Sequence, residues 1–330
     1  MSHRPGIIIA SLAVLTLALL VADLTVGSVA VSCRELVAAL TGGDCPPVIR
    51  KIVVDIRLVK AIVAIMAGAA LSVSGLQMQT LFRNPMAGPY VLGISSGASL
   101  GVALLILGTP LIGIHGFLSD LGVAGAAWLG SAAVLAVVAL ASHRIGDIMA
   151  ILILGMMFAS GVGAVVQILQ YLSDEQSLKS FVVWTMGSLA DVTGSQLAIL
   201  VPAVLGGLLL AAAAVKPLNM LLLGDTYARS LGLNLRRWRM VIFLSTTLLA
   251  GTVTAFCGPI GFIGLAMPHV ARMLIATSDH RRLVPATMLL GAAVLLLCDM
   301  ISKVYALPVN AITALLGIPV VVWIVLQRNR

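Results

Sequence analysis

Charged residues are scarce in this chain of 330 residues: they make up 10% of it, against 60% hydrophobic residues and a mean hydropathy of +1.13. An ordinary soluble domain carries about a quarter charged residues, so a water-soluble fold is excluded. The apolar runs do not alternate with polar residues, which excludes membrane-spanning strands. A spanning helix needs about 20 mostly apolar residues. The composition predicts an all-α, polytopic membrane protein with about ten transmembrane helices, in a single domain over residues 1–330.

The sequence also lacks the motifs of nucleotide binding and catalysis. It contains no GxxxxGKS or GxxxxGKT phosphate loop, no HExxH, no CxxC and no Rossmann glycine pattern. No charged residue lies near the centre of an apolar run, where ion-coupled carriers place theirs, since Asp147, Asp191 and Asp299 lie at run ends. We therefore expect no catalytic residue, no metal site and no cofactor bound by this chain, and a partner that supplies any energy for transport.

Acidic residues are few as well, with 12 Asp and Glu against 20 Lys and Arg, which gives a net charge of +8. The basic residues lie in gaps between apolar runs and form no patch interleaved with aromatic residues. Nucleic acid is therefore not an expected partner. In a membrane protein, such a surplus of basic residues usually reflects which loops face the cytoplasm.

Apolar runs and their breaks predict ten spans. The first run is long enough to be a retained span rather than a signal peptide. An even count puts both termini on one side, and a cytoplasmic N-terminus places 13 of the 20 Lys and Arg inside. The predicted spans cover residues 7–30, 58–81, 91–110, 121–141, 147–170, 197–215, 240–257, 262–276, 284–302 and 309–327. The basic residues left outside are Arg34, Arg50, Lys51, Arg57, Lys60, Lys179 and Lys303.

Only four cysteines are present. Cys33 and Cys45 fall in the first outer loop, where an oxidising compartment permits a disulfide that closes a short loop. The alternative is two independent thiols. Cys257 and Cys298 lie in or near spans and are expected to be small apolar packing residues.

The longest inner connection, residues 216–239, is the candidate site at which a partner delivers energy. Its pattern predicts two short helices and a glycine stop. Small residues there would let another protein approach closely, and Leu231 and Leu233 would offer apolar knobs. The alternative is an amphipathic connector with topogenic arginines. The candidate coupling residues are Gly224, Asp225, Ala228, Arg229, Leu231, Gly232 and Leu233.

Two further segments are rich in glycine. The second span ends at Arg83, Asn84 and Pro85. Residues 93–101 then form a small-residue face on the third span, which suits tight helix crossing. The alternative is a polar corner beside a pore. Residues 257–285 combine a glycine-proline break with a histidine and an arginine. A helix beginning near Gly261 would point its positive end outward, where an anionic group could rest. His269 is expected to be a hydrogen-bonded structural residue rather than a metal ligand.

Five ordered segments from Asp55 to Leu326 resemble the FecCD-type permeases of ATP-binding-cassette importers for iron siderophores, heme and vitamin B12. The most specific is GPIGFIGLAMPHVAR, which contains Gly258, Pro259, Gly261, Gly264, Pro268, His269 and Arg272. The resemblance implies the type II importer permease fold in the bacterial inner membrane. It also implies a second permease copy, two cytoplasmic ATPases that use ATP and Mg, and a periplasmic substrate-binding protein.

The resemblance also assigns individual residues. Arg57, Lys60 and Lys303 match positions that meet acidic residues of the binding protein, although the family usually has arginine at the last two. Asn84 and Met86 resemble an inner gate, and Ile148 and Met149 its companion, where relatives often carry small hydroxyl residues. Alternatives are an ion-coupled secondary transporter, which would need an intramembrane ionisable pair, and a membrane-embedded enzyme that uses His269.

Overall fold

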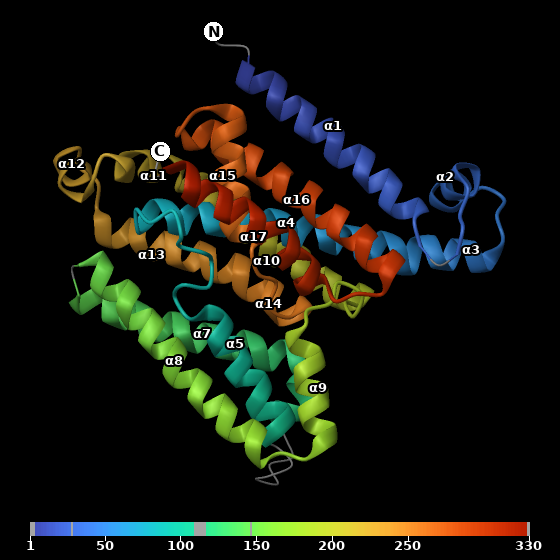
Figure 1. The fold of residues 1–330 in the computed structure, drawn as a ribbon, viewed down its shortest axis with the longest axis horizontal. Coiled ribbons are helices and arrows are strands. Elements are labelled where there is room, and N and C mark those ends of the chain that lie inside the picture. Colours follow the sequence, from blue (N-terminus) through green and yellow to red (C-terminus); the bar gives the residue numbers. More distant parts are fainter. Residues whose placement is uncertain (1–3, 28, 109–116, 146, 329–330) are drawn as a thin grey trace.

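The computed structural model describes residues 4–27, 29–108, 117–145 and 147–328, and its regular structure is entirely helical within these ranges. Figure 1 shows long helices that run roughly along one direction, with short helices at both ends. The first half contains α1 (Arg4–Thr25), α2 (Cys33–Thr41), α3 (Pro47–Lys51), η1 (Ile52–Leu58), α4 (Val59–Leu81), α5 (Ile94–Ala103), η2 (Leu104–Gly108), α7 (Phe117–Arg144) and α8 (Ile148–Leu172). The second half contains α9 (Glu175–Thr185), α10 (Gly194–Ala213), α11 (Val215–Leu222), α12 (Asp225–Ser230), α13 (Leu235–Thr246), η3 (Thr247–Gly251), α14 (Thr252–Cys257), α15 (Ile263–Ile275), α16 (His280–Tyr305) and α17 (Val309–Arg328).

Each of the ten predicted spans coincides with a helix or a continuous run of helices, which confirms the all-α fold class. Residues 109 and 110, which end the third predicted span, lie outside the described residues. By length and composition, six helical segments of the described chain could cross a membrane: Pro5–Thr25, Gly122–Ser142, Ile148–Leu172, Gly194–Ala213, Leu235–Cys257 and His280–Tyr305. Three apolar helices are shorter: Ile94–Gly108, Ile263–Ile275 and Val309–Trp323.

The remaining span, α4, forms the centre of the bundle. Of its 23 residues, 18 are buried, and it packs against α10, α13, α15 and α16. A helix that is apolar on every side is expected to be surrounded by other helices. Figure 1 shows α4 running through the middle of these elements.

Glycine contacts explain how the helices come so close. A Cβ atom on Gly75 of α4 would overlap the carbonyl group of Gly264 in α15. The small-residue face of the third span behaves alike, because a Cβ atom on Gly97 would lie 2.5 Å from the carbonyl oxygen of Gly130 in α7. This confirms the packing interpretation of residues 93–101, since without a hydrophobic force between helices in lipid, close backbone approach supplies much of the attraction.

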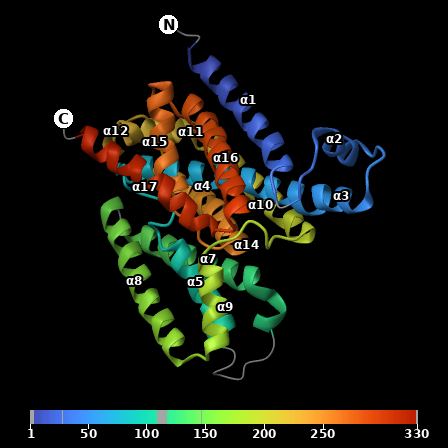
Figure 2. The same cartoon turned by 45° about the vertical axis from the view of Figure 1, so that its right-hand side comes forward.

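Different short helices lie at the two ends of the bundle. In Figures 1 and 2, α12 and the ends of α1 and α17 nearest the termini lie toward one end, while α2, α3 and α9 lie toward the other. We refer to the first as the α12 end and to the second as the α9 end. The placement agrees with the even number of predicted spans.

Helix crossing gives a test of the packing. We expect Gly75→Ala to destabilise the protein by about 1–3 kcal/mol, because the added methyl group forces α4 and α15 apart. Thermal unfolding of the purified protein in detergent measures the loss. Gly161→Ala in α8 is the matched control, since nothing lies within 4 Å of the added atom and alanine favours helix. Equal melting temperatures for the two variants would contradict the crossing.

Candidate functional site

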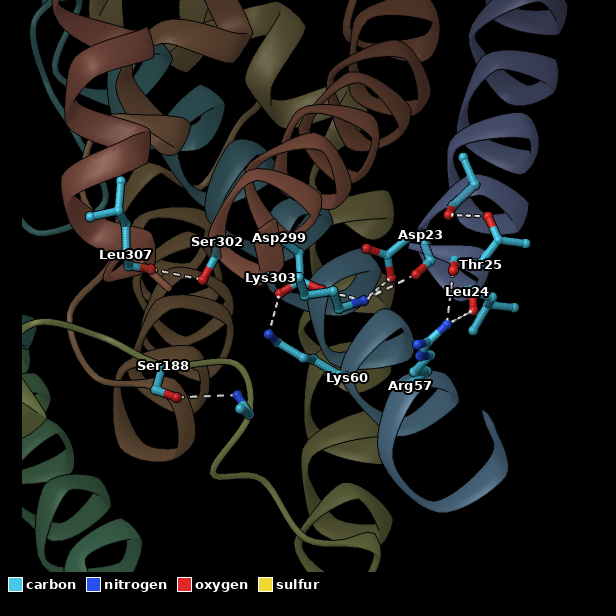
Figure 3. Close-up of polar contacts among 12 residues, drawn as sticks. Asp23, Leu24, Thr25, Arg57, Lys60, Ser188, Asp299, Ser302, Lys303 and Leu307 are labelled. Atoms are coloured by element: carbon cyan, nitrogen blue, oxygen red, sulfur yellow. Dashed lines mark hydrogen bonds and ion pairs between the residues drawn. The ribbon is translucent and has the colours of Figure 1, made fainter. Parts of the chain in front are cut away.

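A buried cluster of charged residues joins α1, α4 and α16 at the α9 end of the bundle (Figure 3). The Lys303 ammonium lies 2.7 Å from the Asp23 carboxylate and 2.8 Å from the Asp299 carboxylate. The Lys60 ammonium lies 3.0 Å from the other oxygen of Asp299. The two carboxylate side chains are 0% exposed, and those of Lys60 and Lys303 are 13% and 9% exposed. The lysines thus neutralise acids of their own chain.

Arg57 is buried beside this cluster and is held by backbone groups. Its guanidinium donates hydrogen bonds to the carbonyl oxygens of Leu24 (2.8 Å), Thr25 (2.9 Å) and Val29. Leu24 and Thr25 belong to the last turn of α1. The C=O groups in the last turn of a helix have no hydrogen-bond partner within the helix. The Arg57 cation therefore completes the end of α1.

The docking role carried over for Arg57, Lys60 and Lys303 is not supported by this geometry, because all three cations are enclosed and already have partners. Sequence reasoning missed Asp23, which is the fourth member of the network. Two signals were available: an acid within an apolar run is itself a functional or structural marker, and Asp299 and Lys303 have the i, i+4 spacing of a helical ion pair.

The two short helices predicted between residues 216 and 239 are present as α11 and α12. Gly232 stops the second one in a left-handed conformation at φ +82°. There the Leu233 N–H donates to the Ala228 carbonyl oxygen at 3.0 Å, and the Gly232 N–H to that of Arg229 at 2.9 Å. This is the glycine helix end that the pattern predicted.

The surface of this coupling segment differs from the expected one. Gly224 and Ala228 are buried within the chain's own core and Leu233 is half-buried, so they cannot serve as a contact face. Leu231 is exposed as predicted, together with Tyr227, which the sequence analysis passed over. The short helix α12 packs its Ala228 side against the core, so only the opposite side, with Tyr227, remains exposed.

Asp225 connects the coupling segment with two other elements. One carboxylate oxygen accepts a hydrogen bond from the Arg239 guanidinium of α13 at 2.6 Å, and the other pairs with the Arg83 guanidinium after α4 at 3.3 Å. Gly224, at φ +106°, lies directly beside Arg83, because a Cβ atom there would be 3.2 Å from the guanidinium. The close approach and the positive φ both require glycine here.

The predicted gate residues lie next to this ion pair. Asn84 follows Arg83, and its side-chain oxygen accepts the Met86 N–H at 2.9 Å, which folds the chain into a tight turn. Ile148 and Met149 begin α8 and line an open cavity of about 450 Å³ together with Arg83 and residues 223–227 of the coupling segment. The structure thus brings the companion gate and the coupling segment together, which sequence spacing could not indicate.

The glycine-proline segment, residues 257–285, also contacts the end of α4 and the turn after it. His269 of α15 places its Nε2 atom 2.7 Å from the Pro85 carbonyl oxygen, and Arg272 donates to the Gln79 side-chain oxygen at 2.7 Å. This confirms His269 as a hydrogen-bonded structural residue. Within the described residues, no group of three or more His, Cys, Asp or Glu could hold a metal.

The start of α15 differs from the predicted anion site. The Gly261 N–H donates to the Asn310 side-chain oxygen at 2.9 Å, so a neutral amide of α17 occupies the position expected for an anionic group. The glycines of the motif serve packing: at Gly258, with φ +72°, a Cβ atom would lie 2.5 Å from the Trp184 carbonyl oxygen. Pro259 follows in the break between α14 and α15, and Pro268 is buried inside α15.

The structure distinguishes the two alternatives for Cys33 and Cys45. All four cysteines are free thiols. Cys33 is exposed at the first residue of α2, whereas Cys45 packs against the core. The Cys33–Cys45 disulfide is therefore absent, and the alternative of two independent thiols applies. Cys257 and Cys298 are buried, as expected for apolar packing residues.

The charged cluster makes a quantitative prediction. Lys303→Met removes the shared partner of two buried carboxylates, so we expect a loss of about 3–5 kcal/mol in stability. Thermal unfolding in detergent measures it. Lys179→Met on the exposed face of α9 removes the same charge from the α9 end and is expected to be neutral. If both variants melt like the unmodified protein, Lys303 is not part of a buried network.

Comparison with known proteins agrees with these observations. A family model described as the FecCD transport family matches residues 15–327. The chain is 35% identical over 335 residues to the hemin transport system permease protein HmuU of Yersinia pestis, covering 99% of this chain and 97% of that protein. It is 35% identical to the vitamin B12 import system permease protein BtuC of Escherichia coli O157:H7, over 84% of each chain.

A solved structure, titled as an inward-facing conformation of a putative metal-chelate type ABC transporter, superposes with a TM-score of 0.85 at 30% identity. The match covers 98% of this chain and 99% of that one. Sequence and structure therefore agree over almost the whole length, and the resemblance found in the five ordered segments is confirmed. The chain belongs to the FecCD transport family.

Proposed function

We propose that this chain is the transmembrane permease subunit of an ATP-binding-cassette importer that moves an iron chelate, either a siderophore complex or heme, or cobalamin from periplasm to cytoplasm. The names of its relatives support heme and vitamin B12, and the similar solved structure of a metal-chelate type transporter supports a chelate. The observation that carries the proposal is the junction of three elements at the α12 end. There the coupling segment, the end of α4 and the start of α8 line one cavity of about 450 Å³.

The proposed assembly contains two copies of this chain, two cytoplasmic ATPases and a periplasmic binding protein, in the bacterial inner membrane. ATP and Mg belong to the ATPases, and this chain binds no cofactor of its own. Both termini and α12 then face the cytoplasm, in keeping with the basic residues of the coupling segment and the positive-inside rule.

The proposed mechanism is alternating access. ATP binding closes the two ATPases, the segment from Gly224 to Leu233 moves with them, and tilting of the helices opens one side of the path as the other closes. Because the binding protein selects the substrate, the path needs only weak contacts with a large chelate. The exposed side chains of Met86 and Met149 near the cavity suit that role, since methionine adapts to irregular surfaces.

The buried cluster gives one argument for an ion-coupled secondary transporter. Asp23 and Asp299 are ionisable groups within helices of the bundle, and the sequence analysis considered only Asp299, at the end of an apolar run. Their position argues against coupling, however. Both carboxylates lie toward the ends of α1 and α16 and are already paired with lysines, which neutralise their charge.

Reconstitution separates the two functions. In proteoliposomes, we expect uptake of hemin, a ferric siderophore or cobalamin only when the ATPase subunits, ATP and the loaded binding protein are all present. A sodium or proton gradient alone is expected to drive no uptake. Gradient-driven uptake by the isolated chain would contradict the proposal and establish a secondary transporter.

A variant of the helix stop tests the coupling segment. We expect Gly232→Leu to lower the substrate transported per ATP hydrolysed, because a side chain at φ +82° costs about 1–2 kcal/mol and displaces the end of α12. Transport and ATPase rates are measured in the same proteoliposomes.

Gly42→Leu is the matched control for this experiment. Gly42 ends α2 at φ +81°, and neither glycine has an atom within 4 Å of the added Cβ. The backbone strain is therefore the same, but it falls at the α9 end of the bundle. Equal coupling ratios in the two variants would show that the end of α12 takes no part in coupling.

A further inference from the structure

We propose that Arg83 is a positioning residue that transmits the movement of α12 to the turn carrying Asn84 and Met86. This rests on the proposed function, because it names the contact through which the ATPases would act on the inner gate. The argument comes from the polar contacts of the α4 end, which differ sharply in burial and length.

The other polar contacts of this region are short, and they are buried or partly buried. Thr80 Oγ1 lies 2.9 Å from His280 Nε2, and the other ring nitrogen of His280 lies 2.7 Å from the side-chain oxygen of Asn219 in α11. Gln79 is held by Arg272 of α15 at 2.7 Å. Water competes less for hydrogen bonds that are buried or partly buried than for exposed ones, so these contacts hold the last turn of α4 in place.

The contact between Arg83 and Asp225 is of another kind. It is 3.3 Å long, and the two side chains are 49% and 33% exposed. The second contact of Asp225, to Arg239, is 2.6 Å long, and the arginine is 6% exposed. Asp225 is therefore anchored firmly to α13 and touches the α4 end through a pair that water can replace. Exposed pairs are weak enough to form and break within a cycle.

The surroundings leave room for this pair to move. Arg83 lies beside Gly224, which has no side chain, and lines the cavity together with Ile148, Met149 and the coupling segment. A well-packed core resists displacement, whereas an open cavity of about 450 Å³ does not. On this side the coupling segment therefore faces a cavity, while its Ala228 side stays packed in the core.

Arg83 also stands at the right place in the chain. It adopts a left-handed conformation, φ +46°, directly before Asn84. The next residue, Pro85, is held to α15 by His269 at 2.7 Å. Because Asn84 and Met86 form one hydrogen-bonded turn, a displacement of Arg83 turns this unit about the point fixed at Pro85. The guanidinium is the part of the unit that reaches the coupling segment.

The test compares Arg83→Gln with Arg83→Lys and Arg144→Gln in the complete complex in proteoliposomes. We expect Arg83→Gln to lower the substrate transported per ATP by about fivefold, the upper range for an exposed ion pair. Arg83→Lys keeps the charge and should recover most of the loss. Arg144→Gln removes an exposed arginine at the end of α7, outside the coupling segment and the residues that line the cavity, and should change nothing.

A second readout distinguishes transmission from a merely structural role. Spin labels at Tyr227 and at Met86, placed in both copies, report the ATP-induced distance changes of α12 and of the turn separately. In Arg83→Gln, the change at Tyr227 should persist while the change at Met86 shrinks. Adding Arg83→Gln to Asp225→Asn should cause no further loss of coupling, because Asp225→Asn already removes the ion pair of Arg83.

Two outcomes count against the proposal. Unchanged coupling and unchanged Met86 movement in Arg83→Gln would overturn the role of Arg83, while the unmodified complex still transports and the proposed function stands. Loss of both movements together with a lower melting temperature would assign Arg83 to folding instead. If the unmodified complex itself shows no ATP-dependent uptake, the failure lies with the proposed function.

Discussion

A charge buried among packed helices is shielded from water, so it must find its counter-charge or a backbone group within the chain. A single unpaired ion in such surroundings costs several kcal/mol, far more than an exposed pair is worth. The cluster of Asp23, Lys60, Asp299 and Lys303 satisfies this constraint by joining helices far apart in the sequence. Arg57 satisfies it with the carbonyl groups that α1 leaves free. The attachment of α1 to the core depends on these contacts.

The same constraint explains what could be predicted from the sequence and what could not. Apolar runs long enough to span a bilayer are fixed by hydropathy, and the ten predicted spans all coincide with helices. Even the eighth, interrupted by Gly258 and Pro259, was placed correctly, as the short helix α15. The end of α12 at Gly232 was also predicted, because a glycine stop is a local signal.

Side-chain partners were harder to predict, because they depend on which helices meet. Lys60 and Lys303 were assigned to an external partner by resemblance, while their acids lie in the chain itself, and one of them, Asp23, was not considered. Gly261 was expected to face an anion, yet Asn310 of the last helix supplies a neutral oxygen. Ala228 was expected to contact a partner because its side chain is small, but this small side chain is buried in the core of the chain. The partners that were missed lie far away along the chain: Asp23 is 280 residues from Lys303, and Asn310 is 49 residues from Gly261.

The two ends of α4 are held by ion pairs of opposite character, and this difference bears on how the bundle could move. At the α9 end, the lysines are nearly enclosed and share fully buried carboxylates, so α1, α4 and α16 form one rigid unit there. At the α12 end, the pair between Arg83 and Asp225 is half exposed and lies beside a cavity. Buried contacts keep their geometry, whereas exposed contacts exchange with water at little cost. Movement driven from the α12 end would therefore be taken up near Arg83 and the turn after it, while the opposite end of α4 stays fixed as the point against which the helices tilt.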